Sequence, residues 1–241
     1  MFLALSLAGC ASMPPDAQSA LPADALLLGE QHDAPAHQRL HQDTVRALAE
    51  RGRLAALALE MADQGATTAG LARTASEADV RQALGWDEGA WPWAAYGPAV
   101  MAAVRAGAPV LGANLPRALM RGAMADDALD QRLAADALTR QREAIRQGHC
   151  DLLPAAQIAP MARIQIARDR AMADTIKHAA QAGRTVVLIA GSAHVDALLG
   201  VPQHLPAGLR AQTVVWPAAP PQRDYCADLR RQMTAPKPAK P

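Results

Sequence analysis

The chain has 241 residues, of which 51% are hydrophobic and 20% charged. That composition supports one sizeable core and excludes an intrinsically disordered protein. The formal net charge is +1, and the basic residues are interspersed with acidic ones. Because no basic stripe is present to neutralise phosphates, we expect no nucleic-acid partner.

The N-terminus opens with an apolar run that ends in Leu7-Ala8-Gly9-Cys10. Small residues before a cysteine are typical of the bacterial lipoprotein signal. We therefore expect residues 1–9 to be a signal remnant, Cys10 to be lipidated and residues 10–22 to form a tether. Such a protein is lipid-anchored, and we expect the outer membrane, facing the periplasm. Since no Lys or Arg precedes the run, we expect the signal to begin upstream of Met1.

Strands and helices alternate along the rest of the chain. Apolar, β-prone runs predict strands at 24–29, 55–60, 109–113, 185–190 and 211–216. Helical patterns cover Pro35–Arg51, Leu71–Leu84 with a break at Ser76–Asp79, and 98–106. With breaks at Asp126 and over 148–154, they also cover nearly all of 116–182. This order predicts an α/β fold with a mostly parallel central sheet flanked by helices. The domain covers 23–216, with a helical subdomain at about 116–182, and a C-terminal extension over 217–241 ends in a disordered tail.

Polar groups follow four of these strands. They are Glu30 and His32 in Gly29-Glu30-Gln31-His32, then Glu60, Asn114 and His194. Because parallel strands bring their carboxyl ends to one edge of a sheet, we expect these groups to share one pocket. Histidine and carboxylate side chains serve as metal ligands or as acid–base catalysts. The alternative is a buried hydrogen-bond network that fastens the helices to the sheet.

The cysteines that remain after lipidation are Cys150 and Cys226. An exported protein lies where disulfides persist, so a Cys150–Cys226 bridge is expected, with two independent buried thiols as the alternative. The bridge would hold the C-terminal segment against the helical region.

Aromatic residues make up only 3% of the chain, yet three of its four tryptophans and one of its two tyrosines lie within 86–96. With this segment, the motifs around the strand ends resemble the ChaN-type haem-binding lipoproteins of the Tiki/TraB/erythromycin-esterase superfamily over residues 24–205. The motifs are Gly29-Glu30-Gln31-His32-Asp33, His37, His41, Leu59-Glu60-Met61, Trp86, Trp91-Pro92-Trp93, Tyr96, Ala113-Asn114-Leu115-Pro116-Arg117, Gln165, Arg168-Asp169, Met172 and Gly191-Ser192-Ala193-His194.

The resemblance implies a haem-binding protein in haem and iron acquisition. It also implies a homodimer that encloses two haems face to face, with an iron ligand that is a tyrosine. The position that fits this ligand best is Tyr96, because a phenolate suits ferric iron and Tyr225 lies past the last strand. The haem would be b type, and an outer-membrane haem receptor would be a further partner.

Three other residues complete the predicted haem site. Trp91 and Trp93 offer flat apolar surface for a porphyrin, although both also suit the core of a helical corner. Arginine forms the best bidentate contact with a carboxylate, so Arg117, with Arg163 and Arg168 as alternatives, is predicted to bind a haem propionate. For Arg168 and Asp169, ordinary salt links within and between helices are the other expectation.

Two other functions remain open. Hydrolytic members of the superfamily use the equivalent Glu and His positions, so the first alternative is a Tiki-like metal-dependent peptidase or esterase that uses Glu30, His32, Glu60 and His194. The same cluster leaves room for a second, divalent metal beside haem. A purely structural lipoprotein is the third reading.

Overall fold

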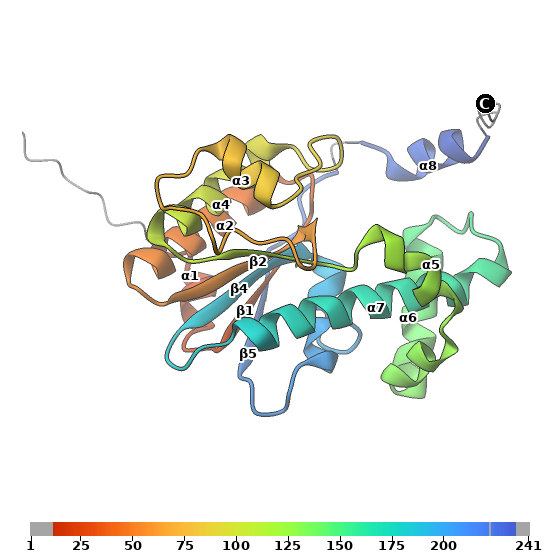
Figure 1. Cartoon of the computed structure of the whole chain (residues 1–241). Helices are drawn as coiled ribbons and strands as arrows, with labels where there is room; N and C mark the ends of the chain where they lie inside the picture. The colour runs from red at the N-terminus through yellow and green to blue at the C-terminus, as the bar shows by residue number, and fades with distance from the viewer. Residues whose placement is uncertain (1–11, 222, 235–241) are drawn as a thin grey trace, which may run out of the picture.

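A five-stranded parallel sheet forms the centre of the molecule (Figure 1). The computed structural model describes residues 12–221 and 223–234. The strands are β1 (Ala25–Glu30), β2 (Leu54–Asp63), β3 (Val110–Asn114), β4 (Thr185–Gly191) and β5 (Ala211–Val215), in the order β3-β2-β4-β1-β5. The predicted α/β fold with a parallel sheet is confirmed.

Helices flank this sheet and extend beyond it. The α-helices are α1 (Pro15–Ser19), α2 (Pro35–Glu50), α3 (Glu77–Ala83), α4 (Trp93–Ala106), α5 (Arg117–Ala125), α6 (Ala135–Gly148), α7 (Ala155–Ala179) and α8 (Tyr225–Thr234). Short 3-10 helices are η1 (Asp127–Arg132), η2 (Ser192–Val195) and η3 (Val201–His204). No helix among the described residues is long and apolar enough to span a membrane.

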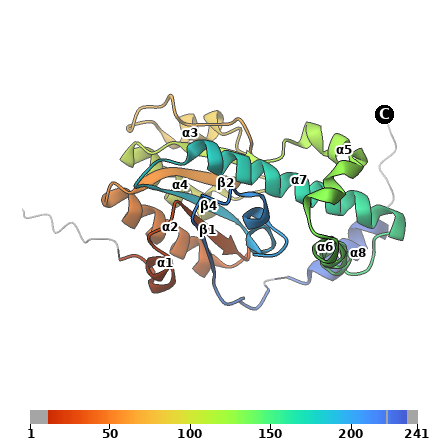
Figure 2. The same cartoon turned by 90° about the horizontal axis from the view of Figure 1, so that it is seen from below.

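The two faces of the sheet carry different side chains. Alternate residues of a strand point to opposite faces. On β1, Leu26 and Leu28 therefore join the core formed with α2 and α4, whereas Leu27 joins the core under α7. Figure 2 shows α7 running across one face of the sheet. The α7 side of β2 presents Ala56 and Ala58, and such small side chains let a helix approach the sheet closely.

Helix α7 joins the sheet to the helical subdomain. It has 25 residues, a length of ~37 Å at the usual helical rise. Its C-terminal part, with Met172 and Ile176, packs on the sheet. Its N-terminal part, with Ile166, packs against Leu129 and Leu133. The predicted subdomain boundary at 182 is therefore too late, because the second part of the helix belongs to the core of the sheet.

Two helix starts differ from the sequence-based prediction. The expected helix Leu71–Leu84 begins only at Glu77, after a capping box in which Ser76 and Asp79 bond each other's backbone N–H groups. Conversely, α4 begins at Trp93 rather than at Pro98. The Glu88 carboxylate accepts the Trp93 N–H at 3.1 Å and so satisfies a donor at the new helix start. Tyr96 is therefore a helical residue.

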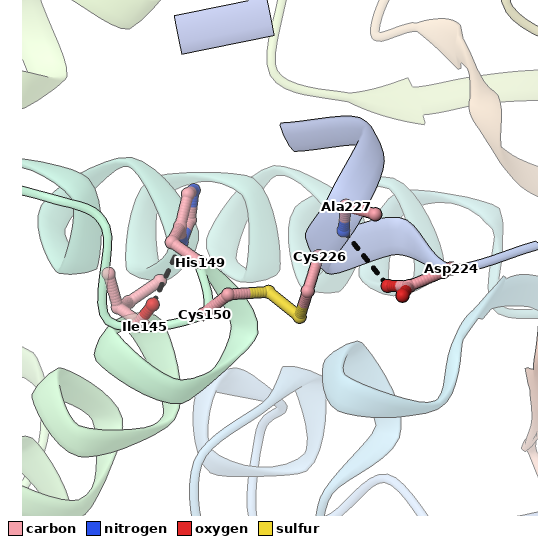
Figure 3. The surroundings of a disulfide bond; sticks show 6 residues. All are labelled: Ile145, His149, Cys150, Asp224, Cys226 and Ala227. Atoms are coloured by element: carbon pink, nitrogen blue, oxygen red, sulfur yellow. Dashed lines mark hydrogen bonds between the residues drawn. A yellow bond between two sulfur atoms is a disulfide. The ribbon is translucent and has the colours of Figure 1, made fainter. Parts of the chain in front are cut away.

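The first and last described segments contain helices that the sequence did not predict. The tether expected over residues 10–22 contains α1, in which Ala17 is fully buried, and Met13 also packs into the core. The extension expected to end in a disordered tail contains α8, which a disulfide between Cys150 and Cys226 joins to the end of α6 (Figure 3). Burial of apolar side chains and the covalent link hold these helices in place. The predicted signal remnant, Cys10 and the tail from residue 235 onward lie outside the described residues.

Candidate functional site

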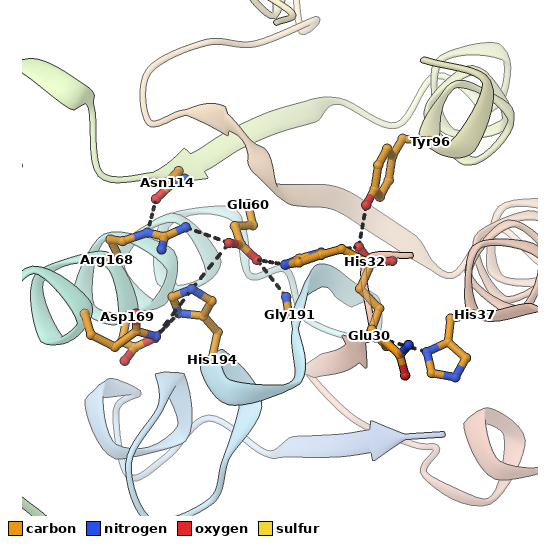
Figure 4. A network of polar contacts seen from close by, with 12 residues as sticks. Glu30, His32, His37, Glu60, Tyr96, Asn114, Arg168, Asp169, Gly191 and His194 are labelled. Carbon is orange, nitrogen blue, oxygen red and sulfur yellow. Dashed lines mark hydrogen bonds and ion pairs between the residues drawn. The ribbon is translucent and has the colours of Figure 1, made fainter. Parts of the chain in front are cut away.

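The carboxyl ends of the three central strands bring the predicted polar groups together (Figure 4). Strand β4 lies between β1 and β2, and Glu30 is paired in register with Gly191. Because His194 follows β4 on η2, its side chain reaches the same edge. The site consists of two clusters, one around Glu30 and one around Glu60.

The first cluster surrounds the buried carboxylate of Glu30. Its Oε1 lies 2.7 Å from His32 Nδ1, and its Oε2 lies 3.2 Å from His41 Nδ1 on α2. The Tyr96 hydroxyl donates a hydrogen bond of 2.6 Å to Oε1. Burial would raise the pKa of Glu30, but the hydrogen bonds from His32 and His41 outweigh it, so the pKa lies below its usual value. Glu30 is therefore ionised at neutral pH.

The hydroxyl of Tyr96 is enclosed by this cluster. The residue is only 2% exposed, and its ring lies edge-on to Trp91 with ring centroids 5.9 Å apart. Burial, together with the charge of Glu30, raises the pKa of Tyr96 far above that of a free tyrosine. Tyr96 is thus a neutral phenol that donates to a carboxylate.

The second cluster surrounds the buried carboxylate of Glu60. The Arg168 guanidinium on α7 donates to Oε1 at 2.6 Å, and the backbone N–H of Gly191 donates to Oε2 at 2.6 Å. Arg168 also donates to Asn114 Oδ1 at 2.8 Å. Despite burial, the positive charges of His194 and Arg168 hold the pKa of Glu60 well below its usual range.

His194 lies between two carboxylates of this cluster. Its Nδ1 is 2.5 Å from Asp169 Oδ1 and its Nε2 is 3.4 Å from Glu60 Oε1. Burial alone would lower the pKa of His194, but the two carboxylates outweigh it and raise the pKa to about 9. Burial raises the pKa of Asp169 to about 6 against the pull of His194. At neutral pH the pair is therefore an imidazolium and a carboxylate.

His32 connects the two clusters and faces solvent. Its Nε2 is 3.9 Å from Glu60 Oε2, and its side chain is 39% exposed. Burial lowers the pKa of His32, but the Glu30 hydrogen bond and the Glu60 charge raise it more, so the net shift is upward. The Trp91 ring packs edge-on against the imidazole at 4.9 Å.

Two adjoining cavities open beside His32, and we call them together the edge groove. Their volumes are about 900 Å³ and 570 Å³. Both are lined by His32, Asp33, Ala90, Trp91, Arg223 and Tyr225. The larger also reaches Glu60, Arg168 and His194, and the smaller reaches Tyr96. A groove of this size with aromatic walls and a few fixed charges suits a small-molecule ligand.

Some of the residues predicted to bind a cofactor line the edge groove, and others do not. Trp91 and Tyr96 line the edge groove. Trp93 does not, because its ring is buried against Trp86 and its indole N–H donates to Glu77 at 2.8 Å. The prediction that Trp93 contacts the cofactor is therefore replaced by a role in the core. Arg117 is exposed at the start of α5, away from the residues that line the groove.

Sequence reasoning undervalued several residues of the site. His37 and His41 lie four residues apart, a spacing that is usual for a solvated polar stripe on a helix, yet both are buried. Arg168 and Asp169 were expected to form ordinary links between helices, yet they contact the polar groups at the strand ends. Their neighbouring positions on one amphipathic helix were visible in the sequence, but their partners are more than 20 residues away. Asn114 accepts a hydrogen bond from Arg168.

Among the residues that the structure describes, no group of three or more His, Cys, Asp or Glu side chains is arranged to hold a metal ion. The Glu30, His32, Glu60 and His194 side chains are close together, but each bonds other protein groups. The buried groups of the two clusters hold protons and orient one another. The solvent-facing sides of His32 and Trp91 remain accessible to a ligand.

Comparison with known proteins places the chain in a family. A family model described as "Haem-binding uptake, Tiki superfamily, ChaN" matches residues 17–205, most of the chain. The protein therefore belongs to the ChaN family of the Tiki superfamily, and the resemblance noted in the sequence is confirmed.

A solved structure supports the same fold. The structure titled "Cofacial heme binding to ChaN of Campylobacter jejuni" matches with a TM-score of 0.67 and 24% sequence identity, over 83% of each chain. No curated protein sequence matches this chain. At this identity the structural match establishes the fold.

Proposed function

We propose that this protein binds haem in the edge groove and serves haem and iron acquisition. The observation that carries the proposal is the groove itself, which combines an aromatic wall with cationic side chains at the carboxyl edge of the sheet. Membership of a family described as haem-binding uptake proteins supports the same function.

The chemistry of the groove fits a porphyrin with two carboxylates. Trp91 and Tyr225 provide flat apolar faces, which give large contact areas at low entropic cost. Arg168 and Arg223 line the groove. Arg168 is already paired with Glu60 at 2.6 Å. Arg223 makes a longer contact of 3.8 Å with Asp228, so Arg223 is the better partner for a propionate. His32 also lines the groove, and its raised pKa favours the imidazolium, which adds a further donor. When bound, haem of b type would supply ferric iron for a protein ligand.

We propose Tyr96 as the axial ligand of that iron. A phenolate is a hard anionic donor, and tyrosine is an established axial ligand of haem iron. In the protein described here Tyr96 is protonated, so ligation requires loss of its phenolic proton. Glu30 already accepts the hydrogen bond from that hydroxyl at 2.6 Å and is the nearest proton acceptor.

Absorbance titration with hemin tests this assignment. Wild-type protein should bind hemin and show a phenolate-to-iron charge-transfer band. Tyr96→Phe should lose that band, because it removes one hydroxyl and keeps the ring. Tyr225→Phe is the matched control, since it removes the other hydroxyl at the groove, and it should keep the band. Loss of the band in Tyr225→Phe but not in Tyr96→Phe would refute the assignment to Tyr96.

We also propose that haem binding promotes a homodimer. A ligand held by one tyrosine keeps one apolar face in water, and two such faces are buried when two chains bring their grooves together across a two-fold axis. Light scattering with and without hemin measures this. A monomer that retains bound hemin at micromolar protein concentration would contradict the dimer.

The hydrolase alternative leads to a different expectation. A metal site would need Glu60 and His194 as ligands, whereas both already bond Arg168 and Asp169. We therefore expect these residues to stabilise the fold. Elemental analysis of protein purified without chelator tests this, and stoichiometric zinc, manganese or cobalt, lost in His194→Ala, would favour the hydrolase.

Lipid anchoring at Cys10 remains part of the proposal. The first described residues lead through α1 to Ala25 at the start of β1, at the amino edge of the sheet, whereas the groove lies at the carboxyl edge. An anchor there would leave the groove facing away from the membrane. Radiolabelled palmitate should enter the wild-type protein in cells and should not enter Cys10→Ser.

A further inference from the structure

The segment after the last strand crosses the edge groove. We call residues 217–221 and 223–226, the described residues that follow the strand, the strap. Its beginning is attached to the strand ends, because His37 Nδ1 accepts the Gln31 N–H and His37 Nε2 lies 3.1 Å from the carbonyl oxygen of Pro217. Ala219 donates its N–H to Gln31 Oε1 at 3.0 Å.

The other end of the strap is attached to the helical subdomain. Cys226 at the start of α8 forms the disulfide with Cys150 at the end of α6 (Figure 3). The strap is therefore held on the sheet side by hydrogen bonds and on the helical side by a covalent bond. Between these attachments it presents Arg223 and Tyr225 to both cavities of the groove.

The two side chains that face the groove form one unit. The Arg223 guanidinium lies over the Tyr225 ring, 4.6 Å from its centroid. Tyr225 is 42% exposed, more than the tryptophans and the other tyrosine among the described residues. A guanidinium in front of an exposed ring matches a ligand with a flat apolar body and an acidic edge.

We infer that the strap is a working part of the ligand site, in which Arg223 binds a carboxylate of a flat tetrapyrrole, Tyr225 packs against its ring system, and the Cys150–Cys226 disulfide holds both in place. This inference rests on the proposed haem-binding function and adds residues to it. The strap lies beyond the region that the family model covers, which ends at residue 205. It is therefore a feature of this chain that family membership does not supply.

We expect the affinity of the site for its ligand to depend on the disulfide. If the bond is absent, the hydrogen bonds at Pro217 and Ala219 still hold the near end of the strap. The far end, with Arg223 and Tyr225, then samples many conformations and must be ordered on binding, which lowers affinity. The core of the sheet does not depend on this link.

Hemin titration of four proteins tests the inference: wild type, Arg223→Ala, the double variant Cys150→Ser with Cys226→Ser, and the control Arg105→Ala. Arg105 is exposed on α4 and does not line the groove. We expect the dissociation constant to rise about tenfold for Arg223→Ala and at least as much for the double variant. The control should match wild type.

A second probe separates the carboxylate contact from other effects. Hemin dimethyl ester has the same ring system but no free carboxylates. Wild type and Arg223→Ala should bind the ester equally, whereas Tyr225→Leu should weaken both ligands. Equal hemin affinity of wild type, Arg223→Ala and the double variant would overturn the role of the strap and leave the proposed function intact. Absence of hemin binding by the wild-type protein would overturn both.

Discussion

Alkaline pH should destabilise this protein through one buried imidazole, that of His194. Its pKa is about 9 in the folded protein against 6.5 for an ordinary histidine, because Glu60 and Asp169 favour the imidazolium. A group whose pKa is raised by folding stabilises the folded state while it is protonated in both states. That contribution is complete below pH 6.5 and disappears as the pH rises through about 9.

The size of the effect follows from the same values. The difference between 6.5 and about 9 corresponds to roughly 3 kcal/mol of unfolding free energy. For a domain of this size, that lowers the melting temperature by roughly 6–12 °C. Titration of the two carboxylates does not contribute to the pH dependence in this range. The pKa of Asp169 is about 6 and that of Glu60 is lower still, so both are ionised from pH 7 upward.

Urea unfolding of wild type and His194→Gln at pH 7, 8, 9 and 10 measures this contribution. The amide keeps a polar side chain of similar size but does not titrate. The loss of unfolding free energy between pH 7 and 10 should therefore be about 3 kcal/mol smaller in the variant than in wild type. If the variant is too unstable to measure, NMR titration of His194 in wild type should give a pKa near 9. Parallel pH profiles for the two proteins, or a pKa below 7, would refute the reasoning.

Two further predictions concern the frame around the site. Glu60→Gln should lower the unfolding free energy by about 3–5 kcal/mol, because it leaves the Arg168 guanidinium, now 2.6 Å from a carboxylate oxygen, without its counter-charge. Urea unfolding at pH 7 checks this, and a loss below about 1 kcal/mol would mean that the pair is solvated. Gly112→Ala should lower the melting temperature strongly or prevent folding, because a Cβ there would lie 2.0 Å from the carbonyl oxygen of Asp63. Gly122→Ala on the exposed face of α5, where a Cβ meets nothing within 4 Å, should instead add about 0.5–1 kcal/mol; equal melting temperatures for the two variants would contradict the packing argument.

Local patterns in the sequence were sufficient for the strands and for the edge where the site lies. Each predicted strand matches an observed one within a few residues, because burial on both faces of a parallel sheet requires a continuous apolar run. The positions of Glu30 and Glu60 at the carboxyl edge followed from parallel topology alone. Gly107 directly follows the predicted helix 98–106 and ends α4 with a φ of 78°, a backbone conformation that glycine adopts without strain.

The partners of those side chains depended on the tertiary structure. Glu30 is bound by Tyr96 and His41 from two different helices, and His194 is bound by Asp169 from a third. The sequence placed Trp91 and Trp93 in one aromatic segment, but only the packing of α4 against the core turned Trp91 toward the groove and Trp93 away from it. Periodicity and turn chemistry act over a few residues, so the sequence by itself determined the elements and their order. The pairing of buried charges depends on which distant elements become neighbours in the order β3-β2-β4-β1-β5, and only the folded chain decides that.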